Sequence, residues 1–386
     1  MLKIIYALLL LPFVVQAELR IAECNYYNHT LFGYSCEVAN FEFMAGDGVQ
    51  ITGTHMPGKS FENVMFVEIL NSTCQVLPQQ FFITFQNLNR FYAQAVEMSA
   101  LNPLSNCESL ENLFLSSNLI DIIRADTFAD CGRLRVLHLQ NNLISTVDRW
   151  AFRDLEDLQV LFLNDNEIEV INPDLFTTVP NLLDLSLSGN RLPTLNVRTF
   201  QPIRYLETLR LARNQFAILN VNILQNLTQL STLLLNGNQF DNFQANFFRH
   251  LPNLRHLNIN DNLLTLVRQL QFDSNPRLAT LTMADNLINE LHANVFLLNV
   301  NLEILDFGNN QVITLPGTLL RANSRLISLG LRRNGITAIQ SNFFDNLPNL
   351  RYINLQSNIC INRFFSIQRP LSVDVAPYLD LCFKNF

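Results

Sequence analysis

The side chains that could carry acid–base or metal chemistry are scattered along this chain of 386 residues. Its six histidines and 33 acidic residues form no His-Glu-x-x-His, Gly-x-Ser-x-Gly or Cys-x-x-Cys motif, and there is no phosphate-binding glycine loop. His138 and His256 are expected on one surface, but the strands that carry them are separated by five repeats of 24 residues. That separation is roughly 24 Å, too far for a shared metal ion. The acidic residues expected on the same surface are equally dispersed: Asp184, Asp261, Asp285 and Asp306. We therefore predict no catalytic, metal-binding or cofactor-binding residues, and a protein that is not an enzyme.

Asparagine provides the strongest periodic signal in the sequence. Eleven asparagines recur at intervals of 24 residues, and each ends a block of the form Leu-x-x-Leu-x-Leu-x-x-Asn. They are Asn118, Asn142, Asn166, Asn190, Asn214, Asn238, Asn262, Asn286, Asn310, Asn334 and Asn358. This block and this interval identify a leucine-rich repeat solenoid, in which each repeat forms one coil.

One repeat explains why these residue types are needed. The leucines within residues 158–166 are expected to point inward, whereas Val160, Phe162 and Asn164 alternate outward along a short strand. The backbone must turn sharply after the strand, and a buried turn would leave amide and carbonyl groups without water. The Asn166 side chain both donates and accepts hydrogen bonds. We therefore predict that it binds backbone groups of its own coil and of the next.

The repeats define the fold class. They start every 24 residues from Leu110, and two weaker repeats start at Val64 and Leu88, where Ser72 and Val96 replace the asparagine. We predict thirteen repeats in total. The predicted class is α/β: a curved leucine-rich repeat horseshoe with a parallel sheet on its concave face, an irregular or short-helical convex side, and disulfide-bonded caps.

Phenylalanine recurs at one position on the convex side of the predicted coils. Leucine replaces it at Leu224 and Leu320, and the recurrence accounts for much of the total of 30 phenylalanines. We expect a stacked aromatic spine made of Phe128, Phe152, Phe176, Phe200, Phe248, Phe272, Phe296 and Phe344.

The two ends of the chain differ from the repeats. Residues 1–17 combine a single lysine, an apolar run shorter than the ~20 residues of a membrane span, and a small residue at the end, which predicts a signal peptide. Residues 18–63 and 361–386 are expected to cap repeats in residues 64–360. The sequence has no hydrophobic tail for a lipid anchor at its C-terminus. We therefore predict a secreted, extracellular protein without a membrane anchor.

The charge balance is acidic. The whole chain has 26 basic and 33 acidic residues, a net charge of −7, and removal of residues 1–17 with Lys3 leaves 25 against 33, or −8. This balance argues against nucleic acid or an anionic membrane as a general partner.

Seven cysteines are consistent with the disulfides of a secreted protein. Two lie in the N-terminal cap, two bracket the C-terminal cap, and two lie at equivalent places on adjacent coils, about 5 Å apart. The predicted pairs are Cys24 with Cys36, Cys107 with Cys131, and Cys360 with Cys382. Cys74 remains, at a position that faces inward in other repeats. We favour a buried free thiol there, and pairing with a cap cysteine is the alternative.

Three sequons predict a glycoprotein. They place glycans at Asn28 in the N-terminal cap, at Asn71 near the rim of the first repeat, and at Asn226 away from the strand face. Glycans at these positions would leave most of the concave sheet open to a partner.

The middle outward residue of each predicted strand describes the concave surface. Aromatic residues gather at its N-terminal end, where Tyr92, Phe114 and Phe162 are interleaved with His138 and flanked by valines. An apolar strip facing solvent is typical of a partner-binding surface. Two alternatives are that the N-terminal cap folds over the strip, or that the strip merely shields the sheet.

Charged residues on the same surface rank second as partner contacts, because most surface ion pairs contribute little energy. The expected neighbours are Arg210 and Arg213 with Asp184 and Glu207, and Arg332 and Arg333 with Asp306 and Glu303. The predicted partner-binding residues are therefore Tyr92, Phe114, His138, Phe162, Arg210, Arg213, Asp306 and Arg332.

The two ends of the chain also carry a resemblance to a known family. The relevant segments are Tyr34-Ser35-Cys36, Asn71-Ser72-Thr73, Leu77-Pro78 and Phe81-Phe82 near the N-terminus, and Asn358-Ile359-Cys360, Arg369-Pro370, Val373-Asp374 and Cys382 near the C-terminus. They resemble the caps of secreted insect extracellular leucine-rich repeat proteins, and more specifically those of the mosquito leucine-rich immune family. The resemblance implies a humoral role in innate immunity, with complement-like thioester proteins or another leucine-rich repeat protein as partner.

The sequence departs from that family in one respect. Its disulfide-paired members carry a double-cysteine segment and a coiled coil after the repeats, whereas this sequence ends four residues after Cys382 without heptads. It resembles the coil-less type, for which we expect a monomer or a weak homodimer. The predicted function is a secreted protein-binding module, an innate-immune recognition or scaffold protein acting through its concave face. The alternative is an adhesion or matrix-type protein that binds a cell-surface receptor or a glycan.

Overall fold

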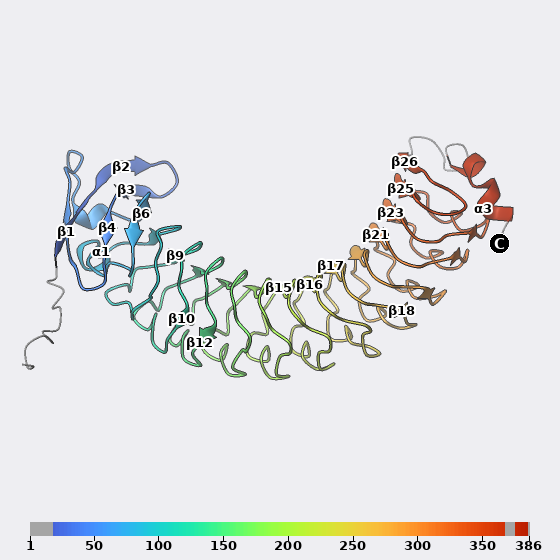
Figure 1. The fold of residues 1–386 in the computed structure, drawn as a ribbon, viewed down its shortest axis with the longest axis horizontal. Coiled ribbons are helices and arrows are strands. Elements are labelled where there is room, and N and C mark those ends of the chain that lie inside the picture. The colour runs from blue at the N-terminus through green and yellow to red at the C-terminus, as the bar shows by residue number, and fades with distance from the viewer. Residues whose placement is uncertain (1–17, 367–374, 385–386) are drawn as a thin grey trace, which may run out of the picture.

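The computed structural model describes residues 18–366 and 375–384. These residues form a curved solenoid in which one sheet lines the concave side and turns, loops and short strands form the convex side (Figure 1). The leucine-rich repeat horseshoe predicted from the asparagine interval is thereby confirmed. The predicted signal peptide lies outside the described residues, as does part of the predicted C-terminal cap.

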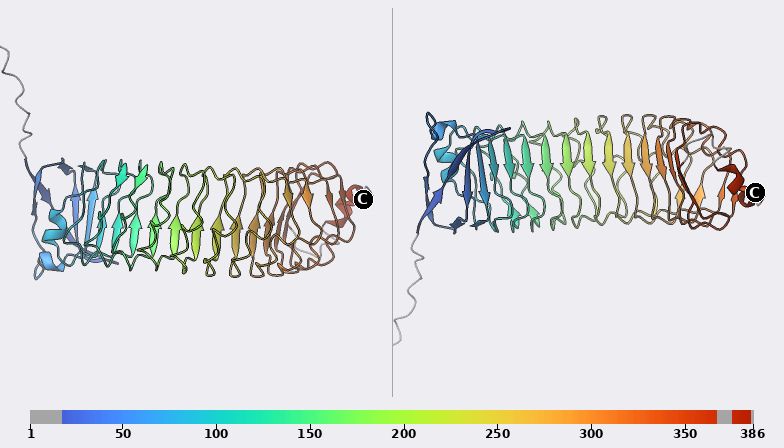
Figure 2. Two further views of the ribbon diagram at one scale, coloured as in Figure 1. Left: turned by 90° about the horizontal axis from the view of Figure 1, so that it is seen from below. Right: turned by 90° about the horizontal axis from the view of Figure 1, so that it is seen from above.

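The concave sheet has sixteen strands, and thirteen of them correspond one to one to the predicted repeats. These thirteen run parallel and in register, so that Leu137 lies opposite Leu113 on one side and Leu161 on the other. Figure 2 shows them side by side along the arc. They are β6 (Phe66–Leu70), β8 (Arg90–Tyr92), β9 (Asn112–Phe114), β11 (Val136–His138), β13 (Val160–Phe162), β14 (Asp184–Ser186), β15 (Thr208–Arg210), β16 (Thr232–Leu234), β17 (His256–Asn258), β19 (Thr280–Thr282), β21 (Ile304–Asp306), β23 (Ser328–Gly330) and β25 (Tyr352–Asn354).

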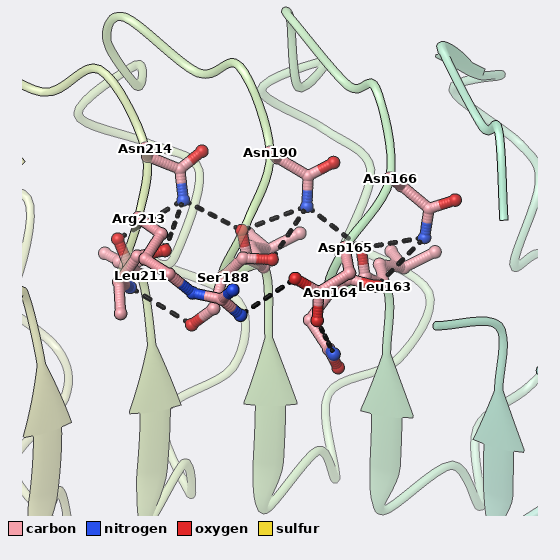
Figure 3. Close-up of polar contacts among 11 residues, drawn as sticks. Leu163, Asn164, Asp165, Asn166, Ser188, Asn190, Leu211, Arg213 and Asn214 are labelled. Atoms are coloured by element: carbon pink, nitrogen blue, oxygen red, sulfur yellow. Dashed lines mark hydrogen bonds and ion pairs between the residues drawn. The ribbon is translucent and has the colours of Figure 1, made fainter. Parts of the chain in front are cut away.

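The asparagines tie each coil to the one before it (Figure 3). Asn190 Nδ2 donates to Leu163 O at 2.9 Å and to Leu187 O at 3.0 Å, and its Oδ1 accepts from Ile168 N at 3.0 Å. Leu163 and Ile168 belong to the preceding coil. The expected direction, toward the next coil, is therefore wrong. It is the N–H two residues after each asparagine that points forward, to the asparagine of the following coil.

The first two repeats manage without this asparagine in different ways. Ser72 Oγ accepts from Phe41 N at 2.9 Å and donates to Leu70 O at 2.7 Å, so it replaces part of the asparagine's bonding. Val96 contributes only backbone groups: its N–H donates to Asn118 Oδ1 at 2.9 Å, and its carbonyl accepts from Cys74 N at 2.7 Å. The hydrogen-bonded stack therefore extends back to the start of the chain's first repeat.

The convex side contains the predicted phenylalanine spine. The spine residues are buried, and neighbouring rings stack in several coils, with 6.3 Å between the centroids of Phe128 and Phe152 and 5.7 Å between those of Phe248 and Phe272. Short parallel pairs add further hydrogen bonds on this side. They are β10 (Ile122–Ile123) with β12 (Thr146–Val147), β18 (Leu266–Val267) with β20 (Glu290–Leu291), and β22 (Thr314–Leu315) with β24 (Ala338–Ile339).

A second, shorter series of asparagines lies on the convex side and was not predicted. Asn275, Asn299 and Asn323 are fully buried and again lie 24 residues apart. Asn299 Nδ2 donates to Phe272 O at 2.9 Å and to Asn275 O at 3.0 Å. In the N-terminal coils the equivalent positions are Cys107 and Cys131, so the same place is cross-linked at one end of the solenoid and hydrogen-bonded at the other.

Antiparallel strands close both edges of the sheet. At the N-terminal edge β2 (Asn25–His29) and β3 (Gly33–Ala39) form a hairpin, and β3 pairs with β6. At the other edge β26 (Phe364–Ser366) pairs with β25. The remaining elements are β1 (Leu19–Glu23) paired with β5 (Gly48–Thr52), β4 (Glu42–Phe43) paired with β7 (Thr73–Cys74), the short helices α1 (Gln80–Thr84) and α3 (Asp380–Lys384), and the 3-10 turns η1 (Phe61–Asn63) and η2 (Ala376–Tyr378).

Three disulfides link the pairs expected from the sequence. The Cα–Cα distances are 5.1 Å for Cys24–Cys36, 4.8 Å for Cys107–Cys131 and 5.1 Å for Cys360–Cys382. Cys74 is a buried free thiol, and the alternative pairing with a cap cysteine is excluded because all four of those cysteines are bonded to each other. Among the described residues, none belongs to a helix long and apolar enough to cross a membrane.

Candidate binding face on the concave side

A row of ring side chains runs across four adjacent strands of the concave sheet. Tyr92, Phe114, His138 and Phe162 lie opposite one another in β8, β9, β11 and β13. Successive ring centroids are 4.2, 4.5 and 4.6 Å apart. The parallel register produces this row, because a 24-residue interval brings each middle outward residue directly beside the next. We call these four residues the aromatic row.

The aromatic row is half-buried by contacts among its own members. All four side chains remain partly exposed, whereas the inward-facing neighbours in the same strands are fully buried: Phe91, Leu113, Leu137 and Leu161. Burial between Phe114 and Phe162 lowers the pKa of His138 below its usual value, and the nearby Asp184 carboxylate partly opposes that shift. Burial therefore favours the neutral form of His138, which suits its place in a largely apolar row.

The β2–β3 hairpin touches only the N-terminal end of this row. In the turn of the hairpin, the Phe32 ring lies 5.1 Å from Phe66 and 6.3 Å from Tyr92, and the Arg90 guanidinium lies 4.8 Å over it. Figure 1 shows the hairpin at the N-terminal end of the arc. The rest of the row is half-exposed. The cap therefore folds over the Tyr92 end of the strip and leaves Phe114, His138 and Phe162 half-exposed.

The other end of the row continues into a charged group. The Arg210 guanidinium lies 5.5 Å from the Phe162 centroid and forms an ion pair with Asp184. In the sheet register, Ser186 lies between Phe162 and Arg210. Because the Ser186 side chain is small and buried, the Arg210 side chain can extend across it to the Phe162 ring. A guanidinium over an aromatic face adds a favourable cation–π contact. The structure thus brings five of the predicted contact residues together: Tyr92, Phe114, His138, Phe162 and Arg210.

Arg213 does not have the neighbours expected from the sequence. Its Nη2 lies 2.8 Å from Asp165 Oδ1, so its partner is neither Asp184 nor Glu207 (Figure 3). Asp165, Gly189 and Arg213 occupy the same position in three successive repeats, and the glycine leaves room for the two charged side chains to meet. The expectation was wrong because it considered only adjacent strands.

Asp306 and Arg332 lie at the far end of the sheet and belong to a different surface. They line an open hollow of about 320 Å³ with Gly330, Tyr352 and Phe364 among its other lining residues. Arg332 and Asp306 are thus near each other as expected, but within the described residues no ion pair joins Arg332 or Arg333 to Asp306 or Glu303. The Asp306 carboxylate instead accepts from Gly308 N at 2.9 Å.

Sequence reasoning missed the apolar rim of this hollow. Ile304, Tyr352 and Phe364 are exposed by 42, 48 and 48% of their surfaces. Ile304 and Tyr352 occupy the first outward position of their strands, whereas the predicted contact residues were taken mainly from the middle outward position. Phe364 comes from β26, outside the repeats, so no periodic signal could have found it.

The remaining predicted features fall elsewhere. The sequon asparagines Asn28, Asn71 and Asn226 are all exposed. His138 and His256 stand in different outward rows of distant strands. Within residues 18–366 and 375–384 no group of three or more His, Cys, Asp or Glu side chains could hold a metal ion.

Comparison with solved structures shows the same fold in several proteins. The Toll chain of the Drosophila Toll–Spätzle complex is 19% identical over 87% of this chain and 47% of Toll, with a TM-score of 0.71. The TLR13 chain of its complex with ssRNA13 is 20% identical over 84% of this chain and 52% of that one, with a TM-score of 0.67. This chain thus spans about half the length of either. The leucine-rich repeat domain of APL1 is 18% identical over 95% of this chain and 92% of that domain, with a TM-score of 0.66. At these identities the likeness shows the fold alone.

Sequence comparison identifies the family. A search of curated protein sequences finds no match. The family model described as leucine rich repeat matches residues 108–168, 157–216, 228–288 and 324–367, which together make up more than half of the chain. The matched residues contain ten of the eleven asparagine-ending blocks and most strands of the concave sheet. The chain belongs to the leucine-rich repeat family.

Proposed function

We propose that this protein is a secreted, non-enzymatic module that binds a protein partner through the aromatic row on its concave face. The main observation in support is that the rings of the aromatic row contact one another without a gap. The row is half-exposed, and it forms one largely apolar surface across four strands. Rigid aromatic side chains lose little conformational entropy on binding, and they are enriched among the residues that contribute most binding energy.

The charges beside the row suggest the chemistry of the partner. Glu37 and Glu68 continue the same register on the N-terminal side, and burial together with Glu37 raises the pKa of Glu68. Arg210 stands at the other end, already paired with Asp184. A partner with an apolar ridge and a basic group at the end near Glu68 would complement this surface.

For the biological setting, we propose humoral innate immunity. The resemblance of the chain's ends to the mosquito leucine-rich immune family supports this setting, as does the match to the APL1 domain over nearly the whole of both chains. The Toll–Spätzle complex, a hub of Drosophila development and innate immunity, provides a case in which a chain of this fold binds a protein. The proposed partner is a complement-like thioester protein or another leucine-rich repeat protein, and the proposed state is a monomer or weak homodimer.

Partner capture from cell-free body fluid of the source organism tests the proposal. The glycosylated protein is immobilised, and retained proteins are identified by mass spectrometry beside the double variant Phe114→Asp with Phe162→Asp. We expect the variant to retain at least about tenfold less partner. The matched control is Val170→Asp with Ile218→Asp, because these residues are 74 and 64% exposed and share one repeat position away from the aromatic row.

The outcomes separate the candidate functions. Capture of thioester or leucine-rich repeat proteins, lost in the first variant and kept in the control, supports the proposal. Capture of membrane or matrix proteins would favour the adhesion alternative instead. Equal retention by the wild type and a folded Phe114→Asp, Phe162→Asp variant would exclude the aromatic row as the binding site.

A further inference from the structure

An open hollow on the side loops of the solenoid coincides with a glycosylation sequon. The hollow has a volume of about 360 Å³ and is lined by Arg204, Tyr205, Gln225, Asn226, Thr228 and Gln229. Asn226 and Thr228 are the asparagine and hydroxyl residues of the sequon, and all six lining residues are exposed. They lie on the loops that lead into β15 and β16, apart from the aromatic row.

Tyr205 stands at a position where several repeats have an asparagine. In five other repeats this asparagine donates to a backbone carbonyl of the preceding coil at 2.7–2.9 Å. These residues are Asn87, Asn181, Asn253, Asn301 and Asn349. Here that position holds an aromatic ring that is 45% exposed. Six other repeats have neither asparagine nor tyrosine at this position, so the coil tolerates the change. What distinguishes this repeat is an exposed aromatic ring beside a sequon.

The ring is held in place by its neighbour. The Arg204 guanidinium lies over Tyr205 at 4.9 Å from the centroid, and its Nη2 donates to Tyr205 Oη at 3.1 Å. Four of the thirteen repeats have a proline at the position of Arg204, and the other repeats have varied residues there. The contacts of Arg204 therefore orient the Tyr205 ring, and a proline at this position could not make them.

The Asn226 side chain is also oriented, and it has a free N–H. Its Nδ2 donates to Gln201 O at 3.3 Å. A primary amide nitrogen has two hydrogens, so this bond uses one and leaves the other position for a glycosidic linkage. The amide, which lines the hollow, is thus oriented by a bond that a glycan at Nδ2 would preserve.

We infer that Asn226 carries an N-linked glycan whose first sugars pack into this hollow against the ring of Tyr205. In the transfer, the amide nitrogen bonds to the anomeric carbon of a lipid-linked sugar diphosphate, the anomeric C–O bond breaks, and the amide proton leaves with the diphosphate. The apolar C–H faces of the sugar then cover the exposed ring, and Gln225, Gln229 and Arg204 surround it with hydrogen-bonding groups. The inference goes beyond the proposed binding function and shares with it only the secretory route.

The test uses the full chain secreted from insect cells. Glycopeptide mass spectrometry shows whether Asn226 is occupied, and Asn226→Gln identifies its glycan by loss of the corresponding mass. Release of the glycan by a peptide amidase is then timed on the native protein. We expect release from Asn226 to be about fivefold slower in the wild type than in Tyr205→Asn, because the packed sugars shield the linkage.

Tyr205→Asn is a suitable variant because it introduces the residue that bonds to the preceding coil in five other repeats, so the coil should fold normally. Equal release rates in the two proteins after denaturation, with slower native release only in the wild type, support the inference. An unoccupied Asn226, or equal native release from the wild type and Tyr205→Asn, overturns it. Neither result depends on partner capture, so failure here is distinct from failure of the proposed function.

Discussion

Arg213 reaches back across a whole coil to Asp165, and its Nη2 lies 2.8 Å from the carboxylate Oδ1 (Figure 3). The two residues share one repeat position with Gly189, which stands between them. Gly189 has a φ of 65°, in the left-handed region, and a side chain there would run into the Asp165 carboxylate. This glycine therefore permits both a tight turn and an ion pair that spans two repeats.

The first prediction concerns Gly189→Ala. We expect it to lower the free energy of unfolding by about 1 kcal/mol, because the methyl group adds backbone strain and displaces Asp165. Arg213→Gln is the control and should cost less than about 0.5 kcal/mol, since the ion pair is solvent-exposed. Thermal unfolding followed by circular dichroism measures both. Equal melting temperatures for the two variants would show that the clash at Gly189 is relieved without cost.

A second prediction follows from the asparagine stack. Asn190→Ala should cost about 2–3 kcal/mol, because Leu187 O loses a bond and the buried Ile168 N–H loses its acceptor. Asn164→Ala, which removes only a half-exposed contact with Asp165, should stay within about 0.5 kcal/mol. Hydrogen exchange at the Ile168 amide provides a local readout beside the melting temperature. Unchanged protection of that amide in Asn190→Ala would contradict the assigned role.

The repeat interval made much of this fold predictable from sequence. A constant spacing of 24 residues determines both the number of repeat strands and their register, so it places Leu137 beside Leu161 and Cys107 beside Cys131. The same spacing places Phe114 beside His138, because residues at one repeat position must be neighbours in a parallel sheet. Those parts of the candidate site were accessible without coordinates.

The unpredicted parts depend on geometry that no repeat specifies. Arg213 can pair with Asp165 only because the residue between them, in the intervening coil, is Gly189, which has no side chain. The contact of Phe32 with Tyr92 depends on where the β2–β3 hairpin turns, and Phe364 reaches the C-terminal hollow on a strand outside the repeats. Periodicity predicts neighbours along the stack and does not predict how long side chains and terminal strands fold back on it.

Cys74 provides a third prediction. Burial raises the pKa of its thiol to about 12, so almost no thiolate exists at pH 8. We expect a thiol reagent to leave the native protein unlabelled and to label one cysteine once the chain is unfolded without reductant. Cys74→Val should remove that labelling. Rapid labelling of the native wild type would show that the thiol is accessible and would contradict its placement in the core.

The fourth prediction concerns acid sensitivity at His138. Burial lowers its pKa in the folded protein, so the unfolded chain takes up this proton more readily. Stability should therefore be lost as the pH falls through about 6.5 toward the lower folded value. We expect His138→Phe to lose less melting temperature between pH 7.5 and pH 5 than the wild type. His55 and His250, whose pKa values burial also lowers, are present in both proteins and cancel in the comparison. An identical loss in both would mean that His138 does not contribute.

The last prediction separates the two ends of the concave face. The rings of the aromatic row touch one another continuously, whereas Tyr352 and Phe364 form the rim of a separate hollow at the far end of the sheet. If the partner docks on the row, Tyr352→Ser with Phe364→Ser should retain it within about twofold of the wild type, while Phe114→Asp with Phe162→Asp should lose it. Both pairs are outward-facing, so loss of folding is not expected and is checked by melting temperature. The reverse pattern would move the binding site to the C-terminal hollow. Loss in both variants would require a partner that spans the arc from β8 to β26, with contacts at both ends.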